Sequence, residues 1–179
     1  STATAFKWES KEYMVGALAR MNLNKNALHT DTQKDTFKYL KVFPSDSVFH
    51  NNLAQAIEML HEVDSSIEIL RELEDSISQE IPIKPKIRKA TGIGVVEAPR
   101  GTLYYQLDLN NKGIVTNANL CIPTQQNIIH LEKDIASYVE QLLQQKKSKE
   151  YITKQIEKMI RAYDPCMSCA THFLRINWS

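Results

Sequence analysis

The 179-residue sequence lacks the features of a membrane-spanning, secreted or nucleic-acid-binding protein. No apolar run approaches the ~20 residues needed to span a bilayer. The first residues, Ser1 to Lys7, lack the apolar core of a secretory signal. The 22 basic and 21 acidic residues leave a net charge of +1, so no global field attracts nucleic acid. We expect neither a transmembrane segment nor a nucleic-acid partner.

Cysteine is also scarce. The chain has three cysteines, an odd number that does not make a disulfide scaffold in a chain of this length. This usage favours a reducing compartment, in which thiols serve as metal ligands or nucleophiles. We therefore expect a cytoplasmic location.

Helical periodicity is the main pattern that is present. Between Asn51 and about Ile77 apolar residues recur every three or four positions, which predicts a long amphipathic helix. A shorter helical stretch is expected around 12–21. The long helix leads into 81–89, where two prolines and four basic residues predict an extended, solvated linker.

A small β region follows the linker. Apolar residues alternate with polar ones over 103–109 and again over 114–122, on either side of Asn110 to Gly113, which predicts a β-hairpin. A shorter strand over 94–97 is expected to precede it.

The helical period returns after Pro123, as far as Leu142, and again over 152–163. The fold class is therefore α+β and mainly helical, a long-helix bundle with a small antiparallel sheet insert and a carboxy-terminal metal-ligand turn. We expect a single domain over 1–179, with helical parts at 1–80 and 124–164, the β insert at 91–123, the ligand motif at 164–172 and a tail at 173–179.

The end of the chain carries the strongest chemical signal. Cys166, Cys169 and His172 are spaced three residues apart, and the Asp164-Pro165 pair stops the preceding helix so that they lie on a turn. Thiolates at i and i+3 can both face one metal ion. Two sulfurs leave a metal half-coordinated, so such a site needs ligands from elsewhere.

Spacing alone leaves three interpretations open. A zinc knuckle would need a second ligand pair, which only Cys121 and the four other histidines could supply. A thioredoxin-like redox pair would need a βαβ context, and here a helix leads into the motif. The third interpretation is two small buried thiols. The metal site is favoured, and Cys121 is interpreted as a buried structural thiol.

Segment 164–172, D-P-C-M-S-C-A-T-H, resembles the carboxy-terminal D-P-C-x-x-C-x-x-H motif of the large subunit of nickel-iron hydrogenases. Segment 97–103, E-A-P-R-G-T-L, resembles that family's E-A-P-R-G-x-L segment, and 113–127 is similar to its stretch ending in P-T-x-x-N. Segment 13–24 also resembles a family segment. Four matches in the right order are far more specific than any one of them.

The resemblance implies a role for each matched residue. Cys166 would be a terminal nickel ligand, and Cys169 would bridge nickel and iron. Arg100 would hold its guanidinium over the open coordination side, with the carboxylate of Asp164 nearby. His172 would bind a separate magnesium or iron ion.

The resemblance also implies a Ni-Fe(CN)2(CO) centre that cleaves H2 heterolytically, with Cys166 as the best candidate to accept the proton. Pro99, Pro123 and Thr124 would surround the cyanide and carbonyl ligands of the iron, which need hydrogen-bond donors in a dry pocket. Without the resemblance, Arg100 would be interpreted as a surface arginine, and Thr124 would be interpreted as a cap of the helix that follows.

The sequence departs from the family pattern in two places. The family's amino-terminal motif, whose C-x-x-C pair supplies the other two cysteine ligands, is absent, so the chain corresponds to the carboxy-terminal portion of a large subunit. Residues 173–179 follow His172, where a maturation endopeptidase normally trims the family's subunits. The implied partners are the missing amino-terminal portion, an iron-sulfur small subunit and that endopeptidase. The alternative function is a helical module with a structural zinc or a metal-free cysteine cluster, inactive on its own.

Overall fold

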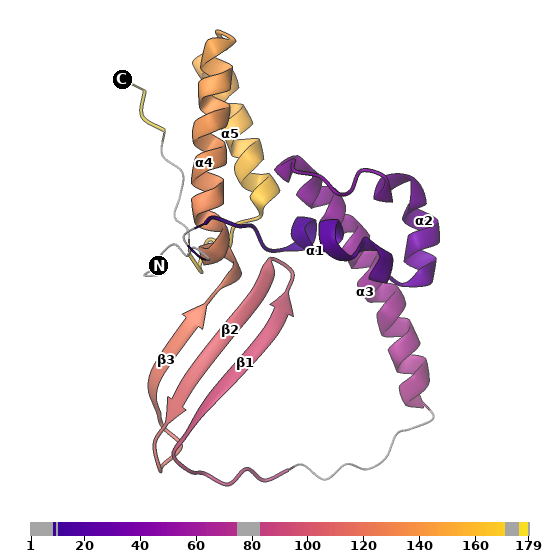
Figure 1. The fold of residues 1–179 in the computed structure, drawn as a ribbon, viewed down its shortest axis with the longest axis vertical. Coiled ribbons are helices and arrows are strands. Elements are labelled where there is room, and N and C mark those ends of the chain that lie inside the picture. The colour runs from indigo at the N-terminus through magenta and orange to yellow at the C-terminus, as the bar shows by residue number, and fades with distance from the viewer. Residues whose placement is uncertain (1–8, 10, 75–82, 171–175, 179) are drawn as a thin grey trace.

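The computed structural model describes residues 9, 11–74, 83–170 and 176–178. Figure 1 shows a helical group formed by the amino-terminal part of the chain, a twisted sheet, and a pair of long helices that stands at one end of the sheet. The helices and strands are α1 Ala17–Asn24, α2 Thr30–Leu40, α3 Asn51–Glu74, β1 Ala90–Ala98, β2 Gly101–Leu109, β3 Val115–Cys121, α4 Pro123–Gln144 and α5 Lys149–Tyr163, with short 3-10 turns at Lys25–Ala27 and Val48–His50.

The helical group is held by a small apolar core between α1 and α3. It contains buried residues from both helices and from the loop before α3, namely Ala17, Leu18, Met21, Phe43, Ala54 and Ile57. Asn51 joins this core to α5, because its side chain accepts from the backbone N–H of Leu18 (3.0 Å) and donates to the carbonyl of Ala162 (2.9 Å). The predicted long helix is confirmed over Asn51–Glu74, and its expected last turn lies outside the described residues.

Helix α2 was not predicted from the sequence. Its buried residues are Thr32 and Thr36 rather than apolar ones, so it shows no hydrophobic period. The hydroxyl of Thr32 donates to the carboxylate of Asp64 on α3 at 2.6 Å, and the hydroxyl of Thr36 donates to the carbonyl of Thr32 at 2.6 Å. Polar contacts with α3 therefore position α2.

The sheet is antiparallel, with strand order β1-β2-β3. Tyr105 pairs with Leu120 and Leu107 with Ala118, so the predicted hairpin and its apolar face are confirmed. Strand β1 is nine residues long, whereas four were expected; Gly92 and Gly94 interrupt its apolar pattern, but it pairs with β2 along its whole length.

The α4–α5 hairpin has its own core, which contains the buried residues Leu142, Ile152 and Ile156. Ser148 caps α5 by accepting from the backbone N–H of Tyr151 at 3.2 Å. Helix α5 ends as predicted: Asp164 adopts a left-handed conformation (φ 49°), and Pro165 follows.

The mainly helical α+β class with a small antiparallel sheet is confirmed, and the metal-ligand turn remains a prediction. Within the described ranges, no helix combines the length and apolar character needed to cross a membrane.

Candidate metal centre

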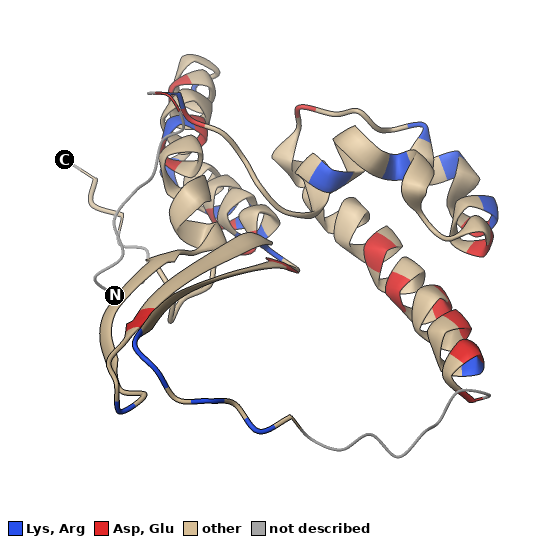
Figure 2. Ribbon diagram, turned by 60° about the horizontal axis from the view of Figure 1, so that its bottom comes forward, with Lys and Arg blue, Asp and Glu red and all other residues tan. Residues whose placement is uncertain are grey.

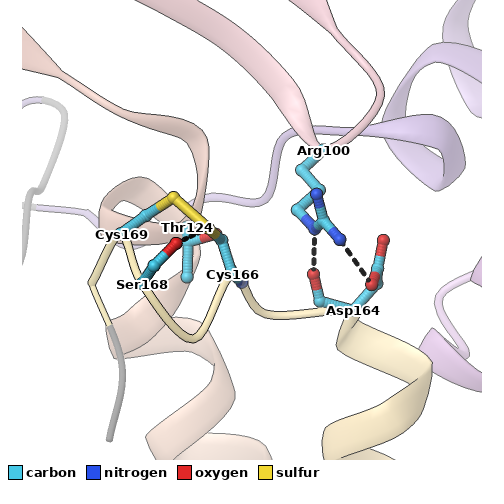
Figure 3. Close-up of a disulfide and its surroundings, with 6 residues drawn as sticks. All are labelled: Arg100, Thr124, Asp164, Cys166, Ser168 and Cys169. Carbon is cyan, nitrogen blue, oxygen red and sulfur yellow. Dashed lines mark hydrogen bonds and ion pairs between the residues drawn. A yellow bond between two sulfur atoms is a disulfide. The ribbon is translucent and has the colours of Figure 1, made fainter.

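Three segments that are distant in the sequence meet at the carboxyl end of α5 (Figure 3): the turn that carries Cys166 and Cys169, the start of α4, and the β1–β2 turn. The backbone N–H of Cys166 donates to the hydroxyl of Thr124 at 3.1 Å. Thr124 is buried at the second position of α4, and Ile122 occupies the N-cap position of this helix. The interpretation of Thr124 as a helix cap is therefore wrong, because its hydroxyl binds the cysteine turn instead.

Arg100 reaches the same region from the β1–β2 turn. Its Nε donates to the carbonyl of Asp164 at 2.7 Å, and its Nη2 lies 3.1 Å from the carboxylate Oδ1 of the same residue. The other carboxylate oxygen of Asp164 accepts from the Gln55 side-chain amide on α3 at 3.0 Å. The structure thus brings Arg100 and Asp164 together, and the two contacts fix the plane of the guanidinium.

The glycine after Arg100 allows this turn to lie close to the irregular segment before α1. Gly101 has φ +134°, and a Cβ added there would lie 2.4 Å from a methyl group of Val15. Asn127 holds the same segment by accepting from the N–H of Val15 (2.8 Å) and donating to its carbonyl (3.0 Å). Asn127, the last residue of the P-T-x-x-N match, therefore positions backbone rather than facing a ligand.

A small cavity of about 10 Å3, lined by Arg100, Thr124 and Tyr163 among others, lies between α4 and the β1–β2 turn. It has room for about one water molecule. The Tyr163 hydroxyl donates to the carboxylate of Asp134 at 2.6 Å. Burial first, and then that carboxylate, raise the pKa of the phenol far above its usual range, so Tyr163 remains neutral.

Arg20 on α1 is a residue of this site that the sequence analysis missed. Its guanidinium binds both carboxylate oxygens of Glu58 on α3, at 2.8 and 2.6 Å. It also pairs with Glu97 and donates to the carbonyls of Ala98 (3.1 Å) and Pro99 (2.9 Å). Arg20 therefore fastens the turn that carries Arg100 to the helical group. The one available signal was that Arg20 lies in the matched segment 13–24.

We expect Arg20→Met to lower the free energy of unfolding by about 2 kcal/mol, because the partly buried carboxylate of Glu58, the exposed carboxylate of Glu97 and two carbonyls lose their donor. Urea denaturation of the reduced chain measures this change. Arg161→Met is the matched control: Arg161 is 72% exposed and lies 3.9 Å from Glu157, so its loss is expected to cost less than about 0.5 kcal/mol. Equal effects of the two substitutions would contradict the role given to Arg20.

The cysteine turn differs from the expectation of free thiols. Cys166 and Cys169 form a disulfide, with their Cα atoms 5.2 Å apart (Figure 3). The physical reason is the i, i+3 spacing of the two cysteines. On a turn, this spacing brings the two sulfurs close enough to bond to each other, just as it would bring them close enough to bind one metal. A metal can bind this pair only after reduction to thiolates.

The remaining predicted residues are placed as follows. Pro99 lies in the β1–β2 turn with its carbonyl bound by Arg20, and Pro123 is the first residue of α4. His172 lies outside the described residues. In the described part of the chain, no three His, Cys, Asp or Glu residues form a group that could hold a metal ion. Cys121 is half-buried rather than buried, and this partial burial raises the pKa of its thiol; its structural role remains a prediction.

Two solved structures with a similar fold are hydrogenases that contain nickel. An NAD+-reducing nickel-iron hydrogenase in its H2-reduced state aligns with a TM-score of 0.75 and 27% sequence identity, over 90% of this chain and 36% of that one. A nickel-iron-selenium hydrogenase of Desulfomicrobium baculatum shares the fold with a TM-score of 0.62 and 20% identity, over 93% of this chain and 36% of that one. The class defined by the fold is thus the nickel-containing hydrogenases.

Sequence comparisons give the family. The profile described as nickel-dependent hydrogenase matches residues 1–172. The beta subunit of the NAD-reducing hydrogenase HoxS of Cupriavidus necator is 36% identical over 173 residues, which is 93% of this chain and 35% of that subunit. The alpha subunit of sulfhydrogenase 1 of Pyrococcus furiosus is 31% identical, over 94% of this chain and 39% of its own length. The chain belongs to the nickel-dependent hydrogenase family, and it spans between a third and two fifths of the length of these relatives.

Proposed function

We propose that this chain supplies half of the nickel-iron centre of a hydrogenase large subunit, and that the completed subunit oxidises H2 or reduces protons. The observation that carries the proposal is the meeting of four motif residues, Arg100, Thr124, Asp164 and Cys166, at the end of α5. They come from three motif segments far apart in the sequence. Family membership supports the same conclusion.

The residues present fit half of the centre. Thiolates are soft ligands that suit nickel and iron, and the turn places two of them within reach of one metal pair once the disulfide is reduced. The described residues offer no further cluster of ligands, so two ligands must come from another segment. When bound, the Ni-Fe(CN)2(CO) centre supplies the redox-active metal and the Lewis acid for heterolytic cleavage of H2.

Each of the matched motif residues has a defined task in this proposal. Cys166 and Cys169 hold the metals, and Cys166 also accepts the proton from H2. Arg100, oriented by Asp164, places a fixed positive charge on the open side of the site. Pro99, Pro123 and Thr124 line the pocket for the cyanide and carbonyl ligands, where a dry environment strengthens each hydrogen bond.

The proposal includes partners and a second metal. His172 binds a magnesium or iron ion, and a maturation endopeptidase removes residues 173–179. The missing amino-terminal portion of the subunit brings the second cysteine pair, and an iron-sulfur small subunit carries the electrons to a soluble acceptor in the cytoplasm. A nicotinamide is the acceptor that agrees with the NAD-reducing relative.

Reconstitution tests the proposal. The reduced chain is assembled with the amino-terminal portion of the subunit, nickel and the iron-ligand machinery, and metal content and H2 uptake are measured. We expect about one nickel and one iron per assembled subunit, with H2 uptake, and neither property for the chain alone. An assembled subunit that holds both metals and does not consume H2 would count against the proposal.

Metal analysis of the chain alone tests the alternative of a structural zinc. Stoichiometric zinc that is lost in a Cys166→Ser, Cys169→Ser double variant would favour a zinc-binding module over a hydrogenase half-site. We expect no such zinc, because a stable structural zinc site has four ligands and the described residues provide no cluster beyond the cysteine pair.

A further inference from the structure

Helix α4 holds the chain on both sides of the Asp164-Pro165 pair. On the carboxyl side, the hydroxyl of Thr124 accepts from the backbone N–H of Cys166 at 3.1 Å. On the amino side, the carboxylate of Asp134 accepts from the hydroxyl of Tyr163 at 2.6 Å. About three helical turns separate Thr124 from Asp134, so both side chains lie on the same face of α4. Figure 1 shows α4 and α5 side by side.

The side chain of Tyr163 is fixed at both of its ends. Its ring is buried in a core formed by α5 and the 3-10 turn before α3. Its hydroxyl donates to Asp134 and also contacts Nδ1 of His130, which lies one helical turn before Asp134 on α4. The hydroxyl has one hydrogen, which goes to Asp134, so Nδ1 of His130 carries a hydrogen and donates it to the phenolic oxygen. Tyr163 cannot turn without breaking both bonds.

Helix α3 contacts the same segment through neutral groups. The side-chain amide of Asn51 donates to the carbonyl of Ala162 at 2.9 Å, and that of Gln55 donates to the carboxylate of Asp164 at 3.0 Å. The acidic residues of α3 all follow Gln55 in the sequence, and Figure 2 shows them along this helix. The α3 contacts are therefore made by amides, whereas the group on α4 that accepts the Tyr163 hydrogen is a carboxylate.

The backbone between these contacts has an uncommon conformation. Asp164 has φ 49° and ψ 51°, in the left-handed region that few residues other than glycine adopt. Such a conformation persists where the surrounding structure fixes the chain on both sides. It allows the carbonyl and the carboxylate of Asp164 to reach Arg100 together, at 2.7 and 3.1 Å (Figure 3). The direction of the Arg100 guanidinium consequently depends on the residues that flank Asp164.

Two observations distinguish Tyr163 from an ordinary buried tyrosine. A buried phenol needs a hydrogen-bond partner, and the hydroxyl of Tyr163 has two, both on α4. Tyr163 also directly precedes Asp164 and lines the small cavity together with Arg100 and Thr124. A change in the position of its side chain would therefore alter both the end of α5 and the space beside the guanidinium.

We propose that Tyr163, held by Asp134 and His130, is a positioning residue that fixes the last turn of α5 against α4 and so sets the direction of the Arg100 guanidinium. The link is a hydrogen bond, and the phenol remains a donor because burial and the nearby carboxylate raise its pKa far above its usual range. This inference rests on the proposed function for the task of the guanidinium. The orientation itself belongs to the chain without metal.

Tyr163→Phe tests the proposal, because it removes the hydroxyl and keeps the ring in the core. Exchange of the Arg100 Nε–H with solvent is measured by NMR on the reduced chain. We expect this exchange to become about tenfold faster, as for the loss of one buried hydrogen bond. Tyr151→Phe is the matched control: Tyr151 is 44% exposed on the same helix, and its substitution should change the rate less than about twofold. Equal exchange rates in the two variants overturn the proposal.

Substitutions of Asp134 distinguish the hydrogen bond from a charge effect. Asp134→Asn keeps an oxygen that accepts from the Tyr163 hydroxyl, so exchange of the Arg100 Nε–H should stay within about twofold of the unsubstituted chain. Asp134→Ala removes the acceptor and should raise the rate as Tyr163→Phe does. The side chain of Asp134 is 34% exposed, so both variants should fold, which circular dichroism verifies. Equally fast exchange in both variants would show that the carboxylate acts through its charge, which overturns the proposal.

Measurements on the assembled subunit separate this inference from the proposed function. In Tyr163→Phe, we expect unchanged nickel content, shifted infrared bands of the carbonyl and cyanide ligands, and H2 uptake per nickel lower by a factor of about 10. Faster Arg100 exchange in the variant chain, with no H2 uptake by the unsubstituted subunit, supports the positioning role and contradicts the function. An active subunit in which Tyr163→Phe changes neither the exchange nor the infrared bands supports the function and overturns the positioning role.

Discussion

Cys166→Ser is expected to abolish nickel binding and H2 uptake in the assembled subunit. A serine hydroxyl is a poor ligand for a soft metal, and the substitution also removes the proposed proton acceptor. Loss of an outer partner of a metal ligand typically costs about 10–100-fold in affinity or activity, and loss of the ligand itself should cost more. Metal analysis and H2 uptake per milligram of complex measure the two effects.

Cys121→Ser is the matched control for that experiment. Cys121 is a half-buried thiol at the end of β3, and it is not in any disulfide of the described residues. The control variant should retain nickel and at least half of the H2 uptake. A Cys166→Ser subunit that keeps its nickel and its activity would show that the cysteine turn is not the metal site.

Arg100→Leu is expected to leave the metals in place and to reduce H2 uptake per bound nickel by a factor of about 100 to 1000. A preorganised charge at a reacting centre contributes about this much to the rate. The H2 uptake per nickel of Arg100→Lys should lie between that of the unsubstituted subunit and that of Arg100→Leu. An ammonium keeps the charge, but it cannot bind the carbonyl and the carboxylate of Asp164 as a fork.

The metal content decides how the Arg100 result is interpreted. If nickel is lost together with activity, Arg100 holds the site together and has no separate part in the reaction. Arg161→Leu provides a control, since Arg161 is 72% exposed and makes only a long ion pair with Glu157. Full activity per nickel in Arg100→Leu would contradict a role for the guanidinium at the open coordination side.

The sequence predicted those site residues that lie in short motifs. Cys166 and Cys169 are close because both lie on one turn, and the Asp164-Pro165 pair ends α5 where the sequence indicated. The meeting of Arg100 with Asp164 depends on residues 64 positions apart, and only the ordered family motifs suggested it. The bond of Thr124 to the N–H of Cys166 was not expected at all, because periodicity does not show which hydroxyl faces another segment.

Contacts between distant polar residues account for most of what the sequence analysis missed. Arg20 binds the β1–β2 turn across 77 to 79 residues, and its surroundings in the sequence are those of an ordinary helix. Helix α2 packs through Thr32 and Thr36, so its sequence has no apolar period. Hydrophobic periodicity detects elements that bury apolar faces, and these two features are positioned by hydrogen bonds.

The hydrogen bond from Gln55 to Asp164 links helix α3 to the residue that orients Arg100. Gln55 belongs to α3, and Asp164, at the end of α5, is the residue against which Arg100 is aligned. A shift of α3 relative to α5 therefore changes the orientation of the guanidinium without any contact at the metals. Because Gln55, Asp164 and Arg100 already make these bonds within this chain, the guanidinium takes its orientation from α3 and α5 and needs no other polypeptide to hold it.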